Sequence, residues 1–553
     1  MNLKGLNENQ LRAVTTDHKR VLVNAGAGSG KTRVVSMRVA YLMHNRVGAR
    51  NIYCITFTRY AAEEMKERII KEDKRNGGKV FVGTFHAFAL NILRKYGDFQ
   101  DTSILGDVEK TKLVEQLVKK FKLKSTNILK NLIKNYDGRS TGIERIVLTE
   151  YMQILKSYNV IDVDLIIPIT LQLLKNEVVL EQVRADVDYL IVDELQDSSE
   201  LHQAIIDAII DEDKHLFCVG DDAQSIYGWN NAKIDYILDF EKKYNAEVIN
   251  LDINYRSSHQ IVQASNNLIS YNKRQLKKNI IATRDGDDIC FEEFTTREQQ
   301  DIKLIGDILG VDDDLSVGIL CRTNADISHY ANLFNSYDIE FCSSAKEKGN
   351  DRILNIIDSV INVENDMLID NVMDVPKEIK LKAMENNISY FEAMCMFKGN
   401  KTTEKYKMLN KSIKKVDAIR AYDAISSELG IGSDKIRVNI ERWLKSKARL
   451  NEGDSIEEYM YYHKTKESQE LLRESNCKVS LLTVHASKGL EFDHIYLPNV
   501  CENNFPKRNE DLEEATRLFY VAITRAKSYL KLYHHLSDEQ AKSRFINQMM
   551  KKA

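Results

Sequence analysis

Short apolar runs alternate with helical stretches along this chain of 553 residues, and this alternation restricts the fold more than any other feature. The first half of the chain contains the runs RVLVNAG (20–26), NIYCITF (51–57), VFVGTF (80–85), DYLIVDE (188–194) and HLFCVGD (215–221). The second half contains SVGILCR (316–322), VSLLTVH (479–485), HIYLPNV (494–500) and KSYLKLYH (527–534). Strands that alternate with helices form parallel sheets with crossover helices. The pattern predicts an α/β fold with two such sheets.

The chain length also favours two cores, because a single hydrophobic core stops growing near roughly 250–300 residues. Between the strands of each predicted core lies a long, mostly helical stretch, which exceeds the length of a loop in a compact domain. We therefore expect a first core from residues 1–97 and 183–270 with an inserted helical domain at 98–182. The second core is expected from residues 271–366 and 473–553, with a second insert at 367–472.

Composition limits the function only in part. The net charge is −3, so any basic surface for nucleic acid must be local. The 8 cysteines are scattered and form no C-x-x-C pair, which makes disulfide and metal-ligand interpretations weak and favours a reducing, cytoplasmic setting. The first residues lack the pattern of a signal peptide, and no apolar stretch approaches the ~18 residues that span a bilayer. No membrane partner is expected.

The sequence NAGAGSGKTRVV (24–35) joins the first apolar run to a helical stretch through closely spaced glycines. Backbone N–H groups of such a loop close around phosphates at a helix N-terminus, where the dipole favours anions. Lys31 would reach the β- and γ-phosphates, and the Thr32 hydroxyl would bind Mg²⁺. A dinucleotide-binding loop fits less well, because that fold has no use for Lys-Thr and no acidic residue follows the second run. A nucleoside triphosphate with Mg²⁺ is the expected ligand.

The acidic stretch VDELQDSSE (192–200) follows the fourth apolar run. Asp193 is placed to hold Mg²⁺, and Glu194 is placed to accept a proton from the attacking water, which predicts a hydrolase. A solvated strand end would explain an isolated Asp-Glu pair equally well, but the phosphate loop upstream favours the catalytic interpretation. Gln196 is not explained by hydrolysis alone, and its amide is suited to couple this site to another segment.

Aromatic side chains follow several of the same predicted strands. VGDDAQSIYGWNNA (219–232) places Tyr227 and Trp229 beyond a strand end, and Phe57, Phe85 and His86 occupy similar positions. A tryptophan there can simply fill a domain seam, but it can also stack on a base, since every base has a π-face. Ligands of open α/β sheets gather at the carboxyl ends of the strands. These aromatics therefore predict a single nucleic-acid strand beside the nucleotide site.

In this order of motifs the chain resembles the superfamily 1 DNA helicases of the UvrD/Rep/PcrA group. The resemblance is carried by LNENQLRAV (6–14), AGAGSGKT (25–32), ITFTRYAAEEMKERI (55–69), VDELQDSSELH (192–202), VGDDAQSIYGWNNA (219–232), LDINYRSSHQIV (251–262), LLTVHASKGLEFDHIYLPNV (481–500) and EEATRLFYVAITRAKSYL (513–530). The chain departs from the family pattern in two places. Arg59-Tyr60 stand where Asn-Lys is usual, and Asn230-Asn231 stand where Arg-Gly is usual.

The resemblance implies two RecA-like parallel-sheet cores with ATP between them, each with a mostly helical accessory insert, the second one shortened. The implied nucleotide contacts are Gln10, Ala25, Gly26, Gly28, Ser29, Gly30, Lys31, Thr32, Arg33, Tyr255 and Glu491. The implied catalytic residues are Lys31, Asp193, Glu194, Gln224, Arg256 and Arg525, with Thr32 and Asp193 at the metal. The implied DNA contacts are Phe57, Thr84, Phe85, His86, Tyr227, Trp229, His485 and Lys488, with Gln196 as the coupling glutamine and Tyr520 near the interface.

The implied activity is ATP-dependent 3′→5′ movement on single-stranded DNA with duplex unwinding, which uses ATP and Mg²⁺ and acts on single strands and ss/dsDNA junctions. A translocase that unwinds little, as the motor subunit of a repair or phage-defence nuclease complex, remains an alternative. A P-loop kinase has no use for the ATRLFYVAITRAK stretch, and a non-catalytic DNA-binding scaffold would not need the catalytic residues. The stretch 110–134, with eight Lys against one Glu, is either a solvated face or a grip on DNA phosphates.

Overall fold

The computed structural model describes residues 3–100, 102–136, 140–343, 351–361, 401–413, 416–431, 477–536 and 541–551, with isolated residues between 362 and 476. The chain divides into two compact units. One contains Met1–Ile104, Asn131–Ala345 and Glu467–Ala553, and the other contains Leu105–Lys130 and Lys346–Lys466. The predicted second insert, 367–472, lies largely outside the described residues, and the expected domain bounds stay predictions.

Among the described residues, the first sheet has six strands in the order β3-β2-β6-β7-β1-β8, and every neighbouring pair is parallel. Its strands are β1 (Arg20–Ala25), β2 (Ile52–Thr56), β3 (Phe81–Thr84), β6 (Tyr189–Val192), β7 (His215–Gly220) and β8 (Glu247–Leu251). The five apolar runs of the first half are therefore confirmed as strands. β8 lies at a sheet edge and was not predicted.

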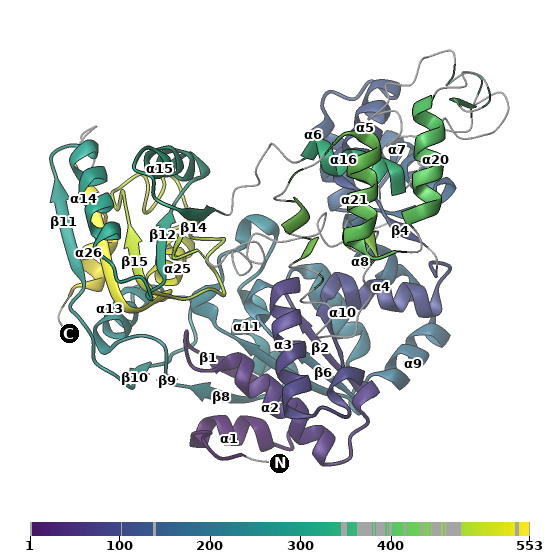
Figure 1. The fold of residues 1–553 in the computed structure, drawn as a ribbon. Helices are drawn as coiled ribbons and strands as arrows, with labels where there is room; N and C mark the ends of the chain where they lie inside the picture. The colour runs from purple at the N-terminus through teal and green to yellow at the C-terminus, as the bar shows by residue number, and fades with distance from the viewer. Residues whose placement is uncertain are drawn as a thin grey trace. The chain divides into compact units, whose positions relative to one another are not determined.

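Helices cover both faces of this sheet (Figure 1). One face carries α1 (Glu8–Thr15), α2 (Lys31–His44) and α3 (Arg59–Glu72). The other face carries α4 (Phe85–Tyr96), α8 (Val163–Leu173), α9 (Glu177–Asp186) and α10 (Glu200–Ile209). Successive side chains of β1 pack on opposite faces, with Val21 and Val23 in one apolar cluster and Leu22 in the other. Such a strand reads as a continuous apolar run because both of its faces are buried.

The second sheet, again among the described residues, has six parallel strands in the order β11-β16-β15-β12-β14-β13. Its strands are β11 (Cys290–Phe294), β12 (Val317–Cys321), β13 (Phe341–Ser343), β14 (Val479–Thr483), β15 (Phe492–Leu497) and β16 (Ala526–His535). One face carries α13 (His259–Ile269), α25 (Leu512–Ile523) and α26 (Arg544–Met549), and the other carries α14 (Arg297–Leu309) and α15 (Asn324–Ser336). The four predicted runs are confirmed, and the two-core α/β fold is confirmed with them.

The remaining elements are short or belong to the insertions. A two-stranded parallel pair, β9 (Ile253–Asn254) and β10 (Ile281–Ala282), follows the first sheet. The other elements are β4 (Ser103–Ile104), β5 (Val160–Ile161), α5 (Asp107–Lys120), α6 (Thr126–Lys134), α7 (Gly142–Ser157), α11 (Asp235–Leu238), α12 (Phe240–Tyr244), α16 (Asp351–Ile361), α20 (Lys401–Ile413) and α21 (Ala418–Leu429). Within the described part of the chain, no helix combines the length and apolar character needed to cross a membrane.

A disulfide joins Cys342 to Cys477, with the two Cα atoms 6.0 Å apart. Cys342 lies in β13 and Cys477 lies just before β14, and these strands pair with Phe341 opposite Val479. The scattered cysteines offered little reason to expect a disulfide, and that expectation is wrong for Cys342 and Cys477. The two cysteines are 135 residues apart in sequence, so no local spacing indicates their contact, and only the sheet pairing brings them together.

This bond generates a prediction about stability. Because it closes a long loop, we expect reductant to lower the stability of the second core by about 2–4 kcal/mol, chiefly by releasing the unfolded chain. The measurement is the denaturant midpoint with and without reductant. The Cys342→Ser/Cys477→Ser variant should have the midpoint of the reduced wild type, both with and without reductant. A wild-type midpoint that does not respond to reductant would show that the bond adds no stability.

Candidate functional site

The loop between β1 and α2 has the backbone of an anion-binding turn. Gly28 and Gly30 have φ values of 69° and 87°, a region that favours glycine. A Cβ on Gly28 would also lie 2.7 Å from Cβ of Arg256, so the position has no room for a larger residue. Helix α2 begins at Lys31 with Gly30 as its N-cap. The first turn of α2 therefore offers N–H groups without intrahelical partners next to this loop.

The two residues expected to contact the nucleotide base lie together beside this loop. The Gln10 side chain is buried and donates to the carbonyl oxygen of Ser29 at 3.0 Å. It also accepts from the backbone N–H of Asn7 at 3.2 Å. The Tyr255 hydroxyl accepts from Asn7 Nδ2 at 2.9 Å, and its side chain is 48% exposed. Gln10 is therefore held in place by the loop, whereas Tyr255 keeps an open ring face.

Two adjacent carboxylates, Asp193 and Glu194, follow β6. Glu194 has a φ of 55°, an uncommon backbone for a residue with a side chain. Burial, and then the charge of Glu194, raises the pKa of Asp193 to about 7. Burial acts against ionisation of Glu194, but the nearby cations, Lys31 first, lower its pKa to about 2. Lys31 Nζ lies 3.3 Å from Glu194 Oε1, so Glu194 is ionised at neutral pH while Asp193 titrates there.

The residues expected to hold Mg²⁺ are Thr32 and Asp193. Both offer oxygen atoms, a hydroxyl and a carboxylate, and these are the ligands that Mg²⁺ prefers. The backbone N–H of Glu194 donates to Asp193 Oδ1 at 3.0 Å, which orients the carboxylate. This donor set fits a Mg²⁺ ion that takes its remaining ligands from phosphate oxygens and water.

The buried amide of Gln196 connects the carboxylates to a second strand end. Its nitrogen donates to a carboxylate oxygen of Glu194, and its oxygen accepts from the backbone N–H of Asp221 at 3.0 Å. The Ser225 hydroxyl donates to the carbonyl of Gln196 at 3.1 Å. Gln224 Nε2 donates to Asp221 Oδ2 at 2.7 Å. Glu194 and the loop after β7 are therefore joined by a single side chain.

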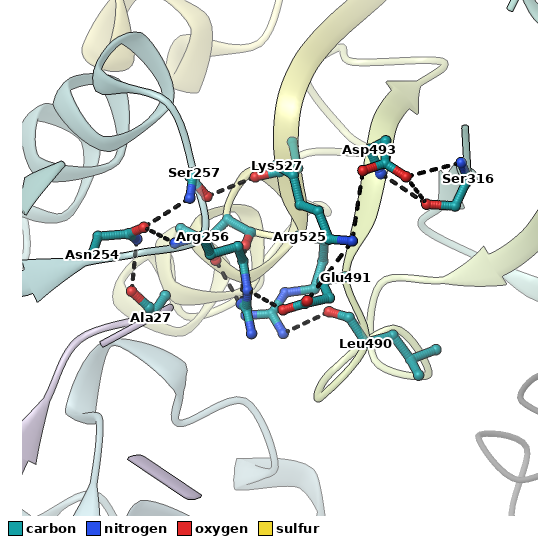
Figure 2. Close-up of polar contacts among 12 residues, drawn as sticks. Ala27, Asn254, Arg256, Ser257, Ser316, Leu490, Glu491, Asp493, Arg525 and Lys527 are labelled. Carbon is teal, nitrogen blue, oxygen red and sulfur yellow. Dashed lines mark hydrogen bonds and ion pairs between the residues drawn. The ribbon is translucent and has the colours of Figure 1, made fainter. Parts of the chain in front are cut away.

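Two arginines of the expected catalytic set lie close together (Figure 2). Arg256 Nε donates to Glu491 Oε2 at 2.6 Å. Arg525 is buried, and its guanidinium donates to the Leu490 carbonyl at 3.2 Å and to Gln224 Oε1 at 3.4 Å. Burial, and then the neighbouring charge of Arg256, lowers the pKa of Arg525 to about 9. A pair of cations that repel each other in a buried site is suited to receive an anion.

Aromatic side chains from three segments form a cluster, two of them after β2 and β7 of the first sheet and the third after β14 of the second sheet. Phe57 and Tyr227 are stacked, with ring centroids 5.1 Å apart. Trp229 stands edge-on to Tyr227 at 6.0 Å and to His485 at 6.3 Å. Trp229 is 67% exposed, so one of its faces is open to a ligand. Burial, and then nearby cations such as Arg322, lowers the pKa of His485 to about 4, which leaves this imidazole neutral.

The next strand end places its predicted DNA contacts differently. Phe85 is buried in the core and stacks on His202 at 4.2 Å. Thr84 accepts from the N–H of Ala87 at 3.2 Å and caps α4. His86 lies edge-on to His202 at 6.2 Å. Phe85 therefore offers no open face to a base in this conformation, and the exposed part of the cluster is centred on Trp229.

Lys488 is also placed in the interior. Its ammonium donates to an oxygen of Asp197 and to the carbonyl of Gln224 at 2.8 Å. It lies 5.0 Å from the ring centroid of Tyr227, a cation–π distance. Lys488 thus holds the aromatic loop by its backbone and by a ring face, whereas sequence reasoning assigned it to DNA.

Several further contacts to this site were not predicted from the sequence. Asn254 donates to the carbonyl of Ala27 in the phosphate loop at 2.7 Å. In α25, Arg517 Nε donates to the Ser225 carbonyl at 2.9 Å, and Glu514 accepts from the N–H of Gly228 at 3.0 Å. Glu514 and Arg517 are three residues apart, which places both on one side of a helix. This spacing is visible in the sequence and could have indicated that the two residues act together. Asn254 has no comparable signal, because its partner is a backbone carbonyl.

Two family profiles of known proteins match this chain. Residues 6–245 match the family profile of the UvrD/REP helicase N-terminal domain, and residues 249–352 and 359–537 match that of the UvrD-like helicase C-terminal domain. The ATP-dependent DNA helicase PcrA of Staphylococcus aureus strain Mu50 is 29% identical over 616 aligned positions, which cover 97% of this chain and 84% of the relative. PcrA of Staphylococcus epidermidis strain RP62A is 28% identical over 633 positions, with coverages of 99% and 86%.

The raised pKa of Asp193 generates a prediction about pH. The folded state keeps its proton up to about pH 7, whereas the unfolded chain releases it near pH 3.8. Stability without nucleotide should therefore fall as pH rises through this window, by up to roughly 4 kcal/mol from this group. Asp193→Asn should remove that part of the fall, as measured by denaturant midpoints between pH 5 and 7.5.

Asp188→Asn is the matched control for this experiment. Asp188 lies just before β6, at the opposite end of the same strand, and its side chain is 49% exposed. We expect this variant to keep the pH dependence of the wild type. If Asp193→Asn also keeps it, Asp193 is ionised throughout this range and the assignment of the titrating carboxylate is wrong.

Proposed function

The chain belongs to the UvrD/REP helicase family, and from that premise we propose that it hydrolyses ATP to move 3′→5′ along single-stranded DNA and to unwind duplex. The nucleotide would bind at the loop before α2, with Lys31 at its phosphates and Glu194 as the base for the attacking water. Thr32 and Asp193 would hold Mg²⁺, which neutralises charge on the phosphate oxygens when bound.

One observation carries the coupling of ATP to DNA. Gln196 joins Glu194 to the backbone of Asp221, and the loop that begins at Asp221 continues to Trp229. A change at the carboxylates on hydrolysis therefore has a short covalent and hydrogen-bonded route to the exposed aromatic ring. A nucleotide store or a kinase has no need for this connection. A motor that must hold and release a strand in each cycle requires it.

The arginine pair supports the chemistry of hydrolysis. Negative charge builds up on the transferring phosphoryl group, and guanidinium groups placed beside it stabilise the transition state. Arg256 comes from the segment after β9 and Arg525 from the segment between α25 and β16. We assign both to the γ-phosphate, where an anion would offset the burial, and then the repulsion from Arg256, that lower the pKa of Arg525.

The aromatic cluster is the proposed strand-binding surface. Trp229 would stack on one base, with Tyr227 and Phe57 behind it. Lys134, the last residue of the Lys-rich stretch, donates to Asn230 Oδ1 at 3.0 Å. Its charge therefore lies next to Trp229, where it would contact a DNA phosphate. This supports the assignment of that lysine to DNA binding.

We do not propose the nuclease-complex alternative, because no observation favours it over a helicase that acts alone. The names of the relatives describe DNA helicases and add no protein partner. The proposed DNA substrates are single strands and junctions of single-stranded and duplex DNA, and the proposed compartment is the cytoplasm.

The direction of movement is tested with two partial duplexes that differ only in the polarity of their single-stranded tail. We expect ATP-dependent strand displacement from the 3′-tailed substrate and little from the 5′-tailed one. Glu194→Gln should bind both DNAs and displace neither, because it retains the shape of the side chain and loses the base. Equal displacement from both tails would contradict the proposed polarity. Strong DNA-stimulated ATPase without displacement would identify a translocase that unwinds little.

The proposed strand-binding surface is tested with Trp229→Ala. We expect it to lose on the order of 1–3 kcal/mol of affinity for an oligo-dT strand, the scale of one base–aromatic contact. ATPase without DNA should stay near wild type, while DNA-stimulated ATPase falls. Fluorescence anisotropy and ATPase assays with and without the strand measure these effects.

Two variants serve as controls for this test of the strand-binding surface. Gln196→Ala should retain most DNA affinity and lose the stimulation, because its amide joins the sites without touching the strand. Tyr337→Ala removes another exposed aromatic, 48% exposed, which lies at the end of α15, and should change nothing. If Trp229→Ala binds the strand as tightly as Tyr337→Ala does, the tryptophan is a packing residue.

A further inference from the structure

A buried lysine outside the predicted motifs lies behind the nucleotide site. Lys278 precedes β10, and its side chain is only 6% exposed. Its ammonium donates to Asp221, to Asp222 Oδ1 at 2.7 Å and to Asn24 Oδ1 at 3.2 Å. Both carboxylates are buried more deeply than the lysine itself. One cation therefore pairs with two buried carboxylates and fills its hydrogen-bonding capacity with three partners.

The three partners of Lys278 belong to the working parts of the site. Asn24 lies in β1, directly before the phosphate loop. Asp221 begins the loop after β7, where it accepts from Gln224 Nε2 at 2.7 Å and donates its backbone N–H to Gln196. Lys278 thus ties the strand that presents the phosphate loop to the loop that carries Gln224.

The same short segment also touches the phosphate loop directly. A Cβ on Gly26 would lie 2.3 Å from Cδ1 of Ile280, so the Ile280 side chain packs against that glycine. Ile281 then pairs with Ile253 in the two-stranded sheet. Ile253 lies three residues before Arg256. Residues 278–281 therefore contact the strand before the phosphate loop, the loop itself, the Gln224 loop and the segment that carries Arg256.

From this arrangement we propose that Lys278 is a positioning residue for ATP hydrolysis. By holding Asp221, it fixes the Gln224 amide and the Gln196 bridge relative to the phosphate loop. It touches neither nucleotide nor DNA in this role. Without the ammonium, Asp221 and Asp222 repel each other in a buried site, and the loop must shift to let water or another cation reach them. A shift of this loop moves Gln224 away from the γ-phosphate while the loop that binds the other phosphates keeps its shape.

The second core contains a matched control for loss of a buried lysine. Lys531 in β16 is 4% exposed and lies between two carboxylates, Glu292 at 2.7 Å and Asp307 at 2.6 Å. It has the same chemistry and similar burial as Lys278, but its partners lie in β11 and α14, outside the proposed site. Lys278→Met and Lys531→Met should both destabilise the protein, so any difference in activity reports on position and not on lost stability.

The experiment compares these two variants in ATPase and nucleotide-binding assays with saturating oligo-dT. We expect Lys278→Met to lower kcat for ATP by about 10- to 100-fold, the scale of a misplaced reacting group, with ADP affinity within about twofold of wild type. The preference of this variant for a non-hydrolysable ATP analogue over ADP should be lost, because the misplaced Gln224 amide contacts only the γ-phosphate. Lys531→Met should keep the wild-type kcat and the wild-type preference.

Equal kcat values for the two variants, whether both normal or both reduced, would overturn the proposal. If Lys278→Met does not fold, Lys278→Met/Asp222→Asn removes one of the unpaired carboxylates, and it is compared with Lys531→Met/Glu292→Gln. The inference rests on the proposed ATPase, and the two failures are distinguishable. A wild-type protein without DNA-stimulated ATP hydrolysis refutes the proposed function, whereas an active wild type with an equally active Lys278→Met refutes only the role of Lys278.

Discussion

The placement of two adjacent carboxylates, the buried Asp193 and the half-buried Glu194, is the constraint on which the site depends. Buried charges are tolerated only when they are paired and hydrogen-bonded. Lys31 approaches from the phosphate loop, Lys488 adds a second nearby cation and Gln196 donates from the next turn. Together these groups lower the pKa of Glu194 and keep it ionised. Burial first, and then the charge of Glu194, raises the pKa of Asp193 into the neutral range. A divalent cation bound at this strand end, as proposed, would compensate this negative charge.

The same requirement links segments that are distant in the sequence. Buried anions of the first core, Asp197 and Asp221, take their cations from Lys488 and Lys278, which lie far along the chain. Each of these lysines also holds the loop after β7, either directly or through Asp221. Charge compensation and the connection between sites are thus made by the same side chains. A substitution that alters the charge compensation is therefore expected to alter the connection between the sites as well.

The strands that could be predicted from the sequence are mostly those in the interior of the sheets. β1, β2, β6 and β7, which are buried on both faces, read as continuous apolar runs. In the two six-stranded sheets, the strands that were missed, β8, β11 and β13, are all edge strands. An edge strand packs fewer side chains, and sequences such as EVINL and CFEEF mix charges with apolar residues. Their pairing depends on a neighbouring strand that is already in place, which a local pattern does not contain.

The sequence by itself determined the phosphate loop, the carboxylates after β6 and the aromatic loop, because their chemistry depends on residues a few positions apart on one turn. Only the tertiary structure decided what those groups contact. It buried Phe85 and Lys488, which sequence reasoning had assigned to DNA, and it brought Lys278 to Asp221 and Cys342 to Cys477. Partners that meet across sheets or between cores leave no local spacing in the sequence, so their contacts emerge only when the chain has folded.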